Sequence, residues 1–248
     1  MVATANVLRD LTPSQARGAL AGVLDHAPDL VGLQEWGRSR WSLMRETGSV
    51  GLVGRLAPRP RVRDQDASAY VWVTPLLGDC SIGARSGRYD LVSSRSLLLS
   101  GIVRAERQDR WLGVEPPRFA TVVRYDDRVT GQRLACVVYH LSPGVQRRGS
   151  YRNDRPRLVA KHQREVRVLQ RLIDDETARG HQVYALGDSN FDGLRFAGLT
   201  SAWAGREDEP GTHAHDRQID DVHGPGRATS VTRVSSESDH RAIVVTRA

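Results

Sequence analysis

The first 35 residues of the chain follow a strand–helix–strand pattern, and this pattern restricts the fold more than any other feature of the sequence. Val2–Leu8 is a short apolar run typical of a strand. Thr12 then offers an N-cap, Pro13 suits the first helical position, and Gln15 can close a capping box. Asp29–Glu35 has the texture of a second strand. Because strands joined through a helix usually pair in parallel, this opening favours an α/β architecture.

The rest of the sequence predicts further strands and one long helix. We expect a second helix over Arg38–Thr47 and a long helix from about Pro156 to Arg179. Between Val50 and about Arg124, short strands separated by Gly, Pro and Ser suggest an antiparallel meander. The strands expected in and after it are Ala69–Thr74, Tyr89–Ser93, Leu97–Ala105, Phe119–Tyr125, Arg133–His140, Gln182–Gly187, Ile219–Val222, Ala228–Val234 and Ala242–Thr246. No linker divides the chain, so we expect a single domain over 1–248.

The charge of the chain has two explanations. The net charge is +7, the pI is about 10.1, and Lys161 is the only lysine, so arginine supplies nearly all of the positive charge. A GC-rich genome would favour arginine codons, whereas a polyanionic partner would favour arginine's bidentate fork. The two cysteines, Cys80 and Cys136, do not suggest a disulfide framework. The sequence shows no signal peptide and no membrane-spanning run, so we expect a soluble, cytoplasmic monomer without membrane insertion, with secretion left open if a signal peptide was trimmed.

Polar residues recur where the predicted strands end. Asn6, Glu35 and His140 each close an apolar run, and Asp188 and Asn190 follow another. Taken singly, each has an ordinary structural explanation, such as an Asx turn or a surface carboxylate. Together they indicate a site, because strand ends in layered α/β proteins are rigid and face open crevices.

Two short motifs are the most informative. In Gly187-Asp-Ser-Asn190, an apolar strand delivers a carboxylate and an amide two residues apart, which suits a water nucleophile beside a phosphate oxygen. Ser238-Asp-His240 places a carboxylate and an imidazole side by side before the last strand, a common arrangement for hydrolysis. The pair His213 and His215 with Asp216 has weak metal-ligand spacing, and we interpret it as a polar loop.

These segments carry a resemblance. With Asn6, Gln34-Glu35, His140-Leu141 and Ile219-Asp220, the two motifs occur in the order and rough spacing of the endonuclease/exonuclease/phosphatase superfamily, the deoxyribonuclease-I-like fold. The match spans residues 6–240. It implies an α/β (α+β) four-layer sandwich of two mixed β-sheets flanked by helices. It also implies a hydrolase acting on phosphate esters, with Mg²⁺ as the cofactor and Mn²⁺ as the alternative ion.

The resemblance also implies a role for each residue. Glu35 and Asn6 look like metal ligands, with Asp239 at the metal or its water shell. His140 and Asn190 resemble groups that hold phosphate oxygens, and Asp188 the group that positions or deprotonates water. His240 looks like the second catalytic imidazole, oriented by Asp220 or by its neighbour Asp221. Counterparts of the arginine or tyrosine that many members place on the phosphate have no motif here, and the candidates are Tyr89, Arg118 and Arg155.

The substrate stays open among three hypotheses. The first is a nuclease acting on nucleic acid, with DNA favoured, because the basic loop after His140 offers Arg147, Arg148 and Arg155 for substrate binding. The same loop could be only a solvated surface. The second is a phosphodiesterase or phosphatase for a small-molecule or lipid head-group phosphate. The third is a catalytically inactive polyanion-binding module.

Overall fold

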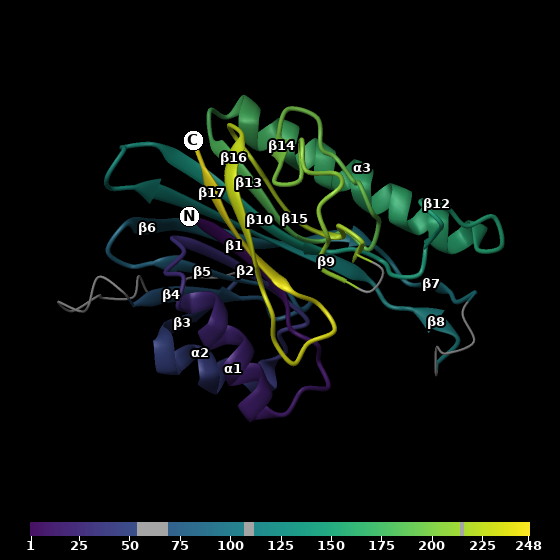
Figure 1. Ribbon diagram of the computed structural model, residues 1–248, viewed down its shortest axis with the longest axis horizontal. Coiled ribbons are helices and arrows are strands. Elements are labelled where there is room, and N and C mark those ends of the chain that lie inside the picture. The colour runs from purple at the N-terminus through teal and green to yellow at the C-terminus, as the bar shows by residue number, and fades with distance from the viewer. Residues whose placement is uncertain (54–68, 107–111, 214–215) are drawn as a thin grey trace.

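Two β-sheets lie face to face in the computed structural model, which describes residues 1–53, 69–106, 112–213 and 216–248 (Figure 1). Within these residues, the first sheet has the strand order β16 (Ala228–Val234), β17 (Ala242–Arg247), β1 (Val2–Asn6), β2 (Leu30–Gln34), β5 (Ser81–Arg85), β4 (Tyr70–Thr74) and β3 (Gly48–Leu52). The second has the order β14 (Thr200–Ser201), β15 (Asp220–Gly224), β13 (Gln182–Asp188), β10 (Arg133–His140), β9 (Arg118–Asp127) and β6 (Tyr89–Ser100). Both sheets mix parallel and antiparallel pairs.

Helices cover the two outer faces of the sandwich. Figure 1 shows α1 (Pro13–Leu24) and α2 (Trp41–Thr47), the latter preceded by the 3-10 turn η1 (Arg38–Arg40), below the first sheet and α3 (Pro156–Ala178) above the second. Two antiparallel strand pairs complete the described elements: β7 (Val103–Arg104) with β8 (Val114–Glu115), and β11 (Gln146–Arg147) with β12 (Ser150–Tyr151), which form a hairpin. The expected four-layer sandwich of two mixed sheets is therefore confirmed.

The strand–helix–strand opening forms as its sequence predicts. Thr12 caps α1, and its capping box with Gln15 is complete, with Pro13 at the first helical position. β1 and β2 pair in parallel, from Val2 beside Leu30 to Asn6 beside Gln34. The parallel register brings the carboxyl ends of both strands to one edge of the sheet. Whatever follows Asn6 and Gln34 must therefore lie close together.

Three apolar layers hold the sandwich together. The central layer, between the sheets, includes Leu30, Ile82, Val138 and Leu186, all fully buried. The second joins α1 and α2 to the first sheet, and the third joins α3 to the second sheet. Burial of such apolar side chains contributes about 25 cal/mol per Å² removed from water, so these layers fix the strand ends firmly.

The predicted antiparallel meander is only partly right. β4 pairs in parallel with β3 and belongs to the first sheet with β5, a strand that the sequence did not suggest. The two predicted strands Tyr89–Ser93 and Leu97–Ala105 are largely one strand, β6, with irregular register at two points. β6 lies at the edge of its sheet, where a strand can expose one face to water. Its polar Ser94–Ser96 stretch interrupts the apolar pattern, and the sequence therefore predicted two strands in place of one.

Cys80 and Cys136 are both buried and free. No described helix has the length and apolar character needed to cross a membrane. His215 lies outside the described residues.

Candidate active site

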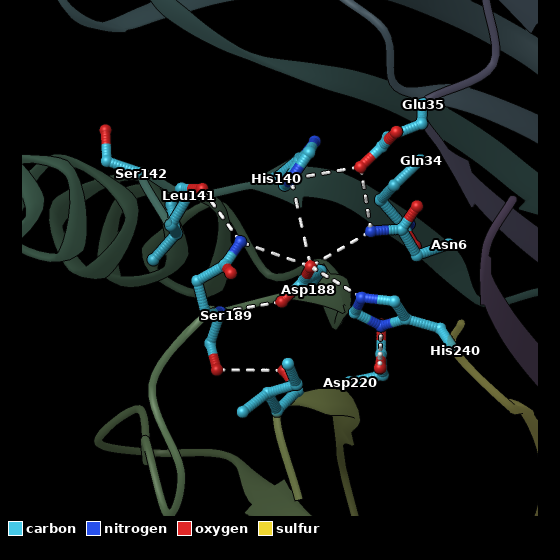
Figure 2. A network of polar contacts seen from close by, with 12 residues as sticks. Asn6, Gln34, Glu35, His140, Leu141, Ser142, Asp188, Ser189, Asp220 and His240 are labelled. Atoms are coloured by element: carbon cyan, nitrogen blue, oxygen red, sulfur yellow. Dashed lines mark hydrogen bonds and ion pairs between the residues drawn. The ribbon is translucent and has the colours of Figure 1, made fainter. Parts of the chain in front are cut away.

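The predicted polar residues meet where strands from the two sheets end. β1 and β2 deliver Asn6 and Glu35 from the first sheet, and the parallel pair β10 and β13 delivers His140 and Asp188 from the second. His140 is the direct register partner of Asp188. Figure 2 shows these side chains pointing toward one another, with His240 entering from the loop before β17.

Asn6 joins the two sheets at this point. Its buried Nδ2 donates to Asp188 Oδ2 at 3.0 Å and lies 3.4 Å from Glu35 Oε1 (Figure 2). Glu35 has a left-handed backbone with φ of 57°, and its other carboxylate oxygen accepts from the Arg9 amide at 3.0 Å. The Ser238 hydroxyl, the first residue of the Ser-Asp-His motif, donates to the Asn6 carbonyl at 2.9 Å. The motif thus holds the end of β1 in place.

Asp188 sits at the centre of the cluster and is 1% exposed. Asn190 turns back on it with φ of 50°, so that its amide N donates to Asp188 Oδ1 at 2.7 Å and its Nδ2 to Asp188 Oδ2 at 3.1 Å. Asn190 Nδ2 also donates to the Leu141 carbonyl. These hydrogen bonds fix the orientation of a carboxylate that has Nε2 of His140 at 3.8 Å and Nε2 of His240 at 3.9 Å from its Oδ2.

Asp79 and Arg118 lie beside Nδ1 of His140, the ring nitrogen that does not face Asp188. His140 Nδ1 lies 3.0 Å from Asp79 Oδ2, which as a carboxylate can only accept, so Nδ1 carries the proton and Nε2 faces the site. Burial would raise the pKa of Asp79, but His140 and Arg118 hold it well below its ordinary value. Arg118 Nη1 lies 3.3 Å from His140 Nδ1 and 4.0 Å from Asp79 Oδ2. Because both nitrogens are then donors, the attraction of Arg118 is to the Asp79 carboxylate. The buried Arg118 Nε has no partner among the described residues.

Of the three candidates without a motif, Arg118 is therefore the one at the cluster. Tyr89 packs against Tyr125 in the central layer, and Arg155 Nη1 donates to the Gly144 carbonyl. Asp79 was missed by sequence reasoning, because it precedes β5 in a loop-like stretch and nothing in its neighbours marks it. Asp79 could be identified only by its position just before β5, and the sequence did not predict β5.

Asp220, and not Asp221, contacts His240. Asp220 Oδ2 accepts from His240 Nδ1 at 2.7 Å and from the Thr212 hydroxyl at 2.5 Å. Asp221, one residue on, points to the other face of β15 and accepts from Ser201 and the Ala202 amide. Burial would lower the pKa of His240, but Asp220, with help from Asp188, raises it to about 10. At neutral pH His240 is thus an imidazolium whose Nε2–H faces Asp188.

Asp239 lies apart from Asn6 and Glu35 in its contacts. Its side chain is 53% exposed, and its Oδ2 lies 3.7 Å from His213 Nε2. The His213 ring packs edge-on against His240 with centroids 4.5 Å apart, so the loop that we interpreted as polar surface reaches the site. Arg217 Nη2 contacts His213 Nδ1 at 2.6 Å and can only donate, so a neutral His213 carries its proton on Nε2.

The three predicted substrate-binding arginines lie on or beside the β11–β12 hairpin. Arg147 ends β11 and Arg148 follows it with φ of 51°, and both side chains are exposed. Arg155 is half-buried at the base of the hairpin. Within the described part of the chain, none of these side chains forms a hydrogen bond or ion pair with the Asp188 cluster, but the hairpin follows His140 by only a few residues.

The donor set fits a hard divalent cation. Asn6 Oδ1 is buried without a hydrogen-bond partner among the described residues, and the 24% exposed Glu35 carboxylate lies beside the same amide group. Oxygen ligands of this kind suit Mg²⁺ or Mn²⁺. Two further groups, Asp188 with Asp220 and His240, and His213 with Asp239 and His240, are close enough to share an ion. The proton on His213 Nε2 disfavours the second of these.

The two packed mixed sheets with helices on their outer faces have the deoxyribonuclease-I-like fold. No family model and no curated protein matches the sequence. The similar solved structures include D. rerio TDP2 humanized by 14 mutations, at TM-score 0.68 and 15% identity over 98% of this chain and 96% of that one. They also include a mannosyl-6-phosphatase of Bacteroides thetaiotaomicron, at TM-score 0.63 and 17% identity over 99% and 98%. The human Nocturnin catalytic domain, with bound sulfate anion, matches at TM-score 0.61 and 16% identity over 98% and 91%. The resemblance is thereby confirmed for the fold.

Proposed function

We propose that this protein is a metal-dependent phosphodiesterase that hydrolyses phosphodiester bonds in nucleic acid. The observation that carries the proposal is the setting of Asp188, a carboxylate fixed by Asn6 and Asn190 and flanked by the Nε2 atoms of His140 and His240 at 3.8 and 3.9 Å. A base between two imidazoles suits in-line attack of water on phosphorus, because the three groups can serve the water, the phosphate oxygens and the leaving oxygen.

Each residue of the cluster has a separate role in the proposed hydrolysis. Asp188 takes a proton from the attacking water as the new P–O bond forms. His140, when its Nε2 is also protonated, donates to a phosphate oxygen, and Asn190 keeps Asp188 oriented. His240, held as an imidazolium by Asp220, gives its Nε2 proton to the leaving oxygen as the ester bond breaks. Asn6 and Glu35 would hold a divalent ion, which when bound supplies Lewis-acid stabilisation of phosphate charge.

The choice of nucleic acid as substrate has two supports. One is the basic hairpin with the exposed Arg147 and Arg148 near the cluster. The other is the likeness to D. rerio TDP2, one structure of which is described as complexed with a single-strand DNA product, at TM-score 0.65 and 15% identity. The likeness to a mannosyl-6-phosphatase supports the alternative, a small phosphate ester, and makes it the second arm of the test.

The test compares substrates and a matched pair of variants. Purified protein is incubated with DNA, RNA and a panel of small phosphoesters, in Mg²⁺ or in EDTA. We expect metal-dependent cleavage of nucleic acid that falls by about 10²- to 10⁴-fold in Asp188→Asn, because the amide cannot accept a proton. Asp192→Asn serves as the control, since that carboxylate caps the Gln218 amide and lies outside the Asp188 hydrogen bonds.

Each other outcome contradicts a stated part of the proposal. Hydrolysis of small esters alone would replace nucleic acid as the substrate class. Full activity in EDTA would refute the metal. No hydrolysis of any ester by the wild type would leave a polyanion-binding module, and an unaffected Asp188→Asn would remove the carboxylate from the chemistry.

A further inference from the structure

The exposed face of α3 carries a row of cations that the Asp188 cluster does not use. All of α3 is described, and between Pro156 and Ile173 its single carboxylate, Glu165, is fully buried. Glu165 accepts from Ser100 and Ser142 on the inner side. The outer side of the same stretch carries four exposed arginines: Arg157, Arg164, Arg167 and Arg171. We name these four the α3 arginine row.

The spacing of the α3 arginine row places its members in one line. Arg157, Arg164 and Arg171 repeat every seven residues, nearly two helical turns, and Arg167 lies between the last two. At about 1.5 Å per residue the row is about 21 Å long. Like charges three and four residues apart disfavour a helix. The row therefore opposes helix stability, and folding alone does not explain it.

Several arginines elsewhere on the surface form ion pairs with neighbouring carboxylates. Examples of such ion pairs are Arg17 with Glu46, Arg88 with Asp127, Arg128 with Asp90, Arg152 with Asp154 and Arg206 with Glu209. Among the residues that the structure describes, no ion pair involves a member of the α3 arginine row. The four arginines of the row thus lack an ion-pair partner in the described part of the chain, although the Glu106 carboxylate accepts from the Arg157 amide at the start of the helix.

The row is continuous with the Asp188 cluster through the β11–β12 hairpin. The Tyr151 hydroxyl lies 3.1 Å from His162 Nδ1, and His162 Nε2 contacts the Ser189 carbonyl at 2.8 Å, inside the turn from Asp188 to Asn190. Gln146 Oε1 accepts from the Asp192 amide at 2.9 Å. The hairpin and the start of α3 are therefore fixed to the turn that holds Asp188.

We propose that the α3 arginine row binds the phosphate backbone of a single-stranded polynucleotide whose scissile ester occupies the Asp188 cluster. That the ester belongs to a polynucleotide rests on the proposed function. A single strand is flexible enough to pass from the cluster over the hairpin and along the helix, and the row offers phosphate contacts without aromatic stacking, so binding is independent of sequence. A membrane fits less well, because the apolar face of α3 is buried against the second sheet.

The test measures binding of the full chain to labelled DNA strands of about six and about 30 nucleotides, in EDTA, across a range of salt concentrations. The test variant is Arg164→Gln/Arg167→Gln/Arg171→Gln. The matched control, Arg45→Gln/Arg133→Gln/Arg227→Gln, removes the same charge from exposed arginines outside α3. We expect the test variant to bind the long strand about tenfold more weakly with a salt slope smaller by about 2, and to bind the short strand as the wild type does.

Three outcomes would contradict binding of a polynucleotide by the α3 arginine row. The two triple variants could lose the same amount of long-strand affinity, or the test variant could keep its long-strand affinity. The test variant could also lose only its binding to vesicles of phosphatidylcholine and phosphatidylserine. Hydrolysis of a small chromogenic phosphodiester separates this proposal from the proposed function. If the wild type hydrolyses no ester while the test variant alone loses long-strand affinity, the proposed function fails and binding by the row stands. If hydrolysis is normal in all three proteins and affinity is unchanged, binding by the row fails and the function stands.

Discussion

At the scale of single residues, the contact between His240 and Asp220 depends on which face of β15 each carboxylate occupies. Ile219-Asp220-Asp221 offers two carboxylates one position apart, and alternation along β15 sends them to opposite faces. Sequence reasoning could identify the pair but not the face, because the face depends on which side of β15 meets the cluster. The Thr212 hydroxyl, which also donates to Asp220, comes from a separate loop and was invisible to local pattern.

We predict that Asp220→Asn lowers the pKa of His240 from about 10 toward its ordinary value, because the amide no longer stabilises the imidazolium. Since the folded-state pKa is raised above 6.5, this pair stabilises the fold fully below pH 6.5, and the contribution is lost as pH rises toward 10. NMR titration of His240 and urea denaturation across this pH range measure both effects. The variant should flatten the decline in stability.

The matched control for that prediction is Asp221→Asn, which changes the neighbouring carboxylate on the opposite face of the strand. Asp221 binds Ser201 and the Ala202 amide, so the change should cost stability while leaving the His240 titration in place. Equal shifts of the His240 pKa in the two variants would show that general charge, and not the Asp220 contact, raises it.

At the scale of elements, local patterns succeeded where one segment determines its own structure. The capping box of Thr12 and Gln15 started α1 as predicted, and Arg133–His140 matched β10. They failed where the structure of a segment depends on the strand beside it. β5 is short and contains Gly83, whose missing Cβ leaves room for the Trp72 ring, so its texture is not that of an isolated strand. Which sheet a strand joins, as with β4 and β6, is likewise a property of its neighbours.

Gly32 gives a second prediction at this scale, because it lies in the middle of β2 against side chains of the opposite sheet. A Cβ there would lie 2.8 Å from Val138 Cγ2 and 3.0 Å from Leu186 Cβ, both in the opposite sheet. We expect Gly32→Ala to destabilise the fold by about 1–3 kcal/mol through overpacking, measured by urea denaturation.

Gly18→Ala is the control for the glycine prediction. Gly18 lies within α1, and a Cβ at this position meets no atom within 4 Å. Alanine should therefore stabilise the helix by about 0.5–1 kcal/mol. If Gly32→Ala were as stable as Gly18→Ala, the sheets would have room to spare at Gly32 and close approach could not explain the glycine.

At the scale of the whole molecule, the cluster depends on bringing together the two ends of the chain and its middle. Asn6 contacts Asp188 across 182 positions in sequence, and Ser238 holds Asn6 across 232. The polar residues themselves could be identified from the sequence because each lies next to an apolar strand. Their convergence could be expected only through the resemblance to a known fold. Asp79 and His213, which come from loops without a motif, needed the folded structure.

This dependence makes metal binding a test of the assembled site. An ion held by Asn6 and Glu35 binds only when β1 and β2 are paired, so it must stabilise the fold by mass action. At about 100 times the dissociation constant the gain is about 2.7 kcal/mol. For a chain of this length that gain raises Tm by about 5–10 °C. Thermal denaturation in Mg²⁺ and in EDTA measures it.

Glu35→Gln should abolish most of the rise in Tm, whereas Glu46→Gln should keep it, because the exposed Glu46 carboxylate pairs with Arg17 on the helices that cover the first sheet. A rise that survives in Glu35→Gln would mean that the ion binds elsewhere in the fold. The orphaned Asn6 Oδ1 would then need another explanation, since a buried acceptor without a partner costs about 1–3 kcal/mol. A bound divalent ion would give this acceptor a partner, and the Glu35 carboxylate lies beside the same Asn6 amide group.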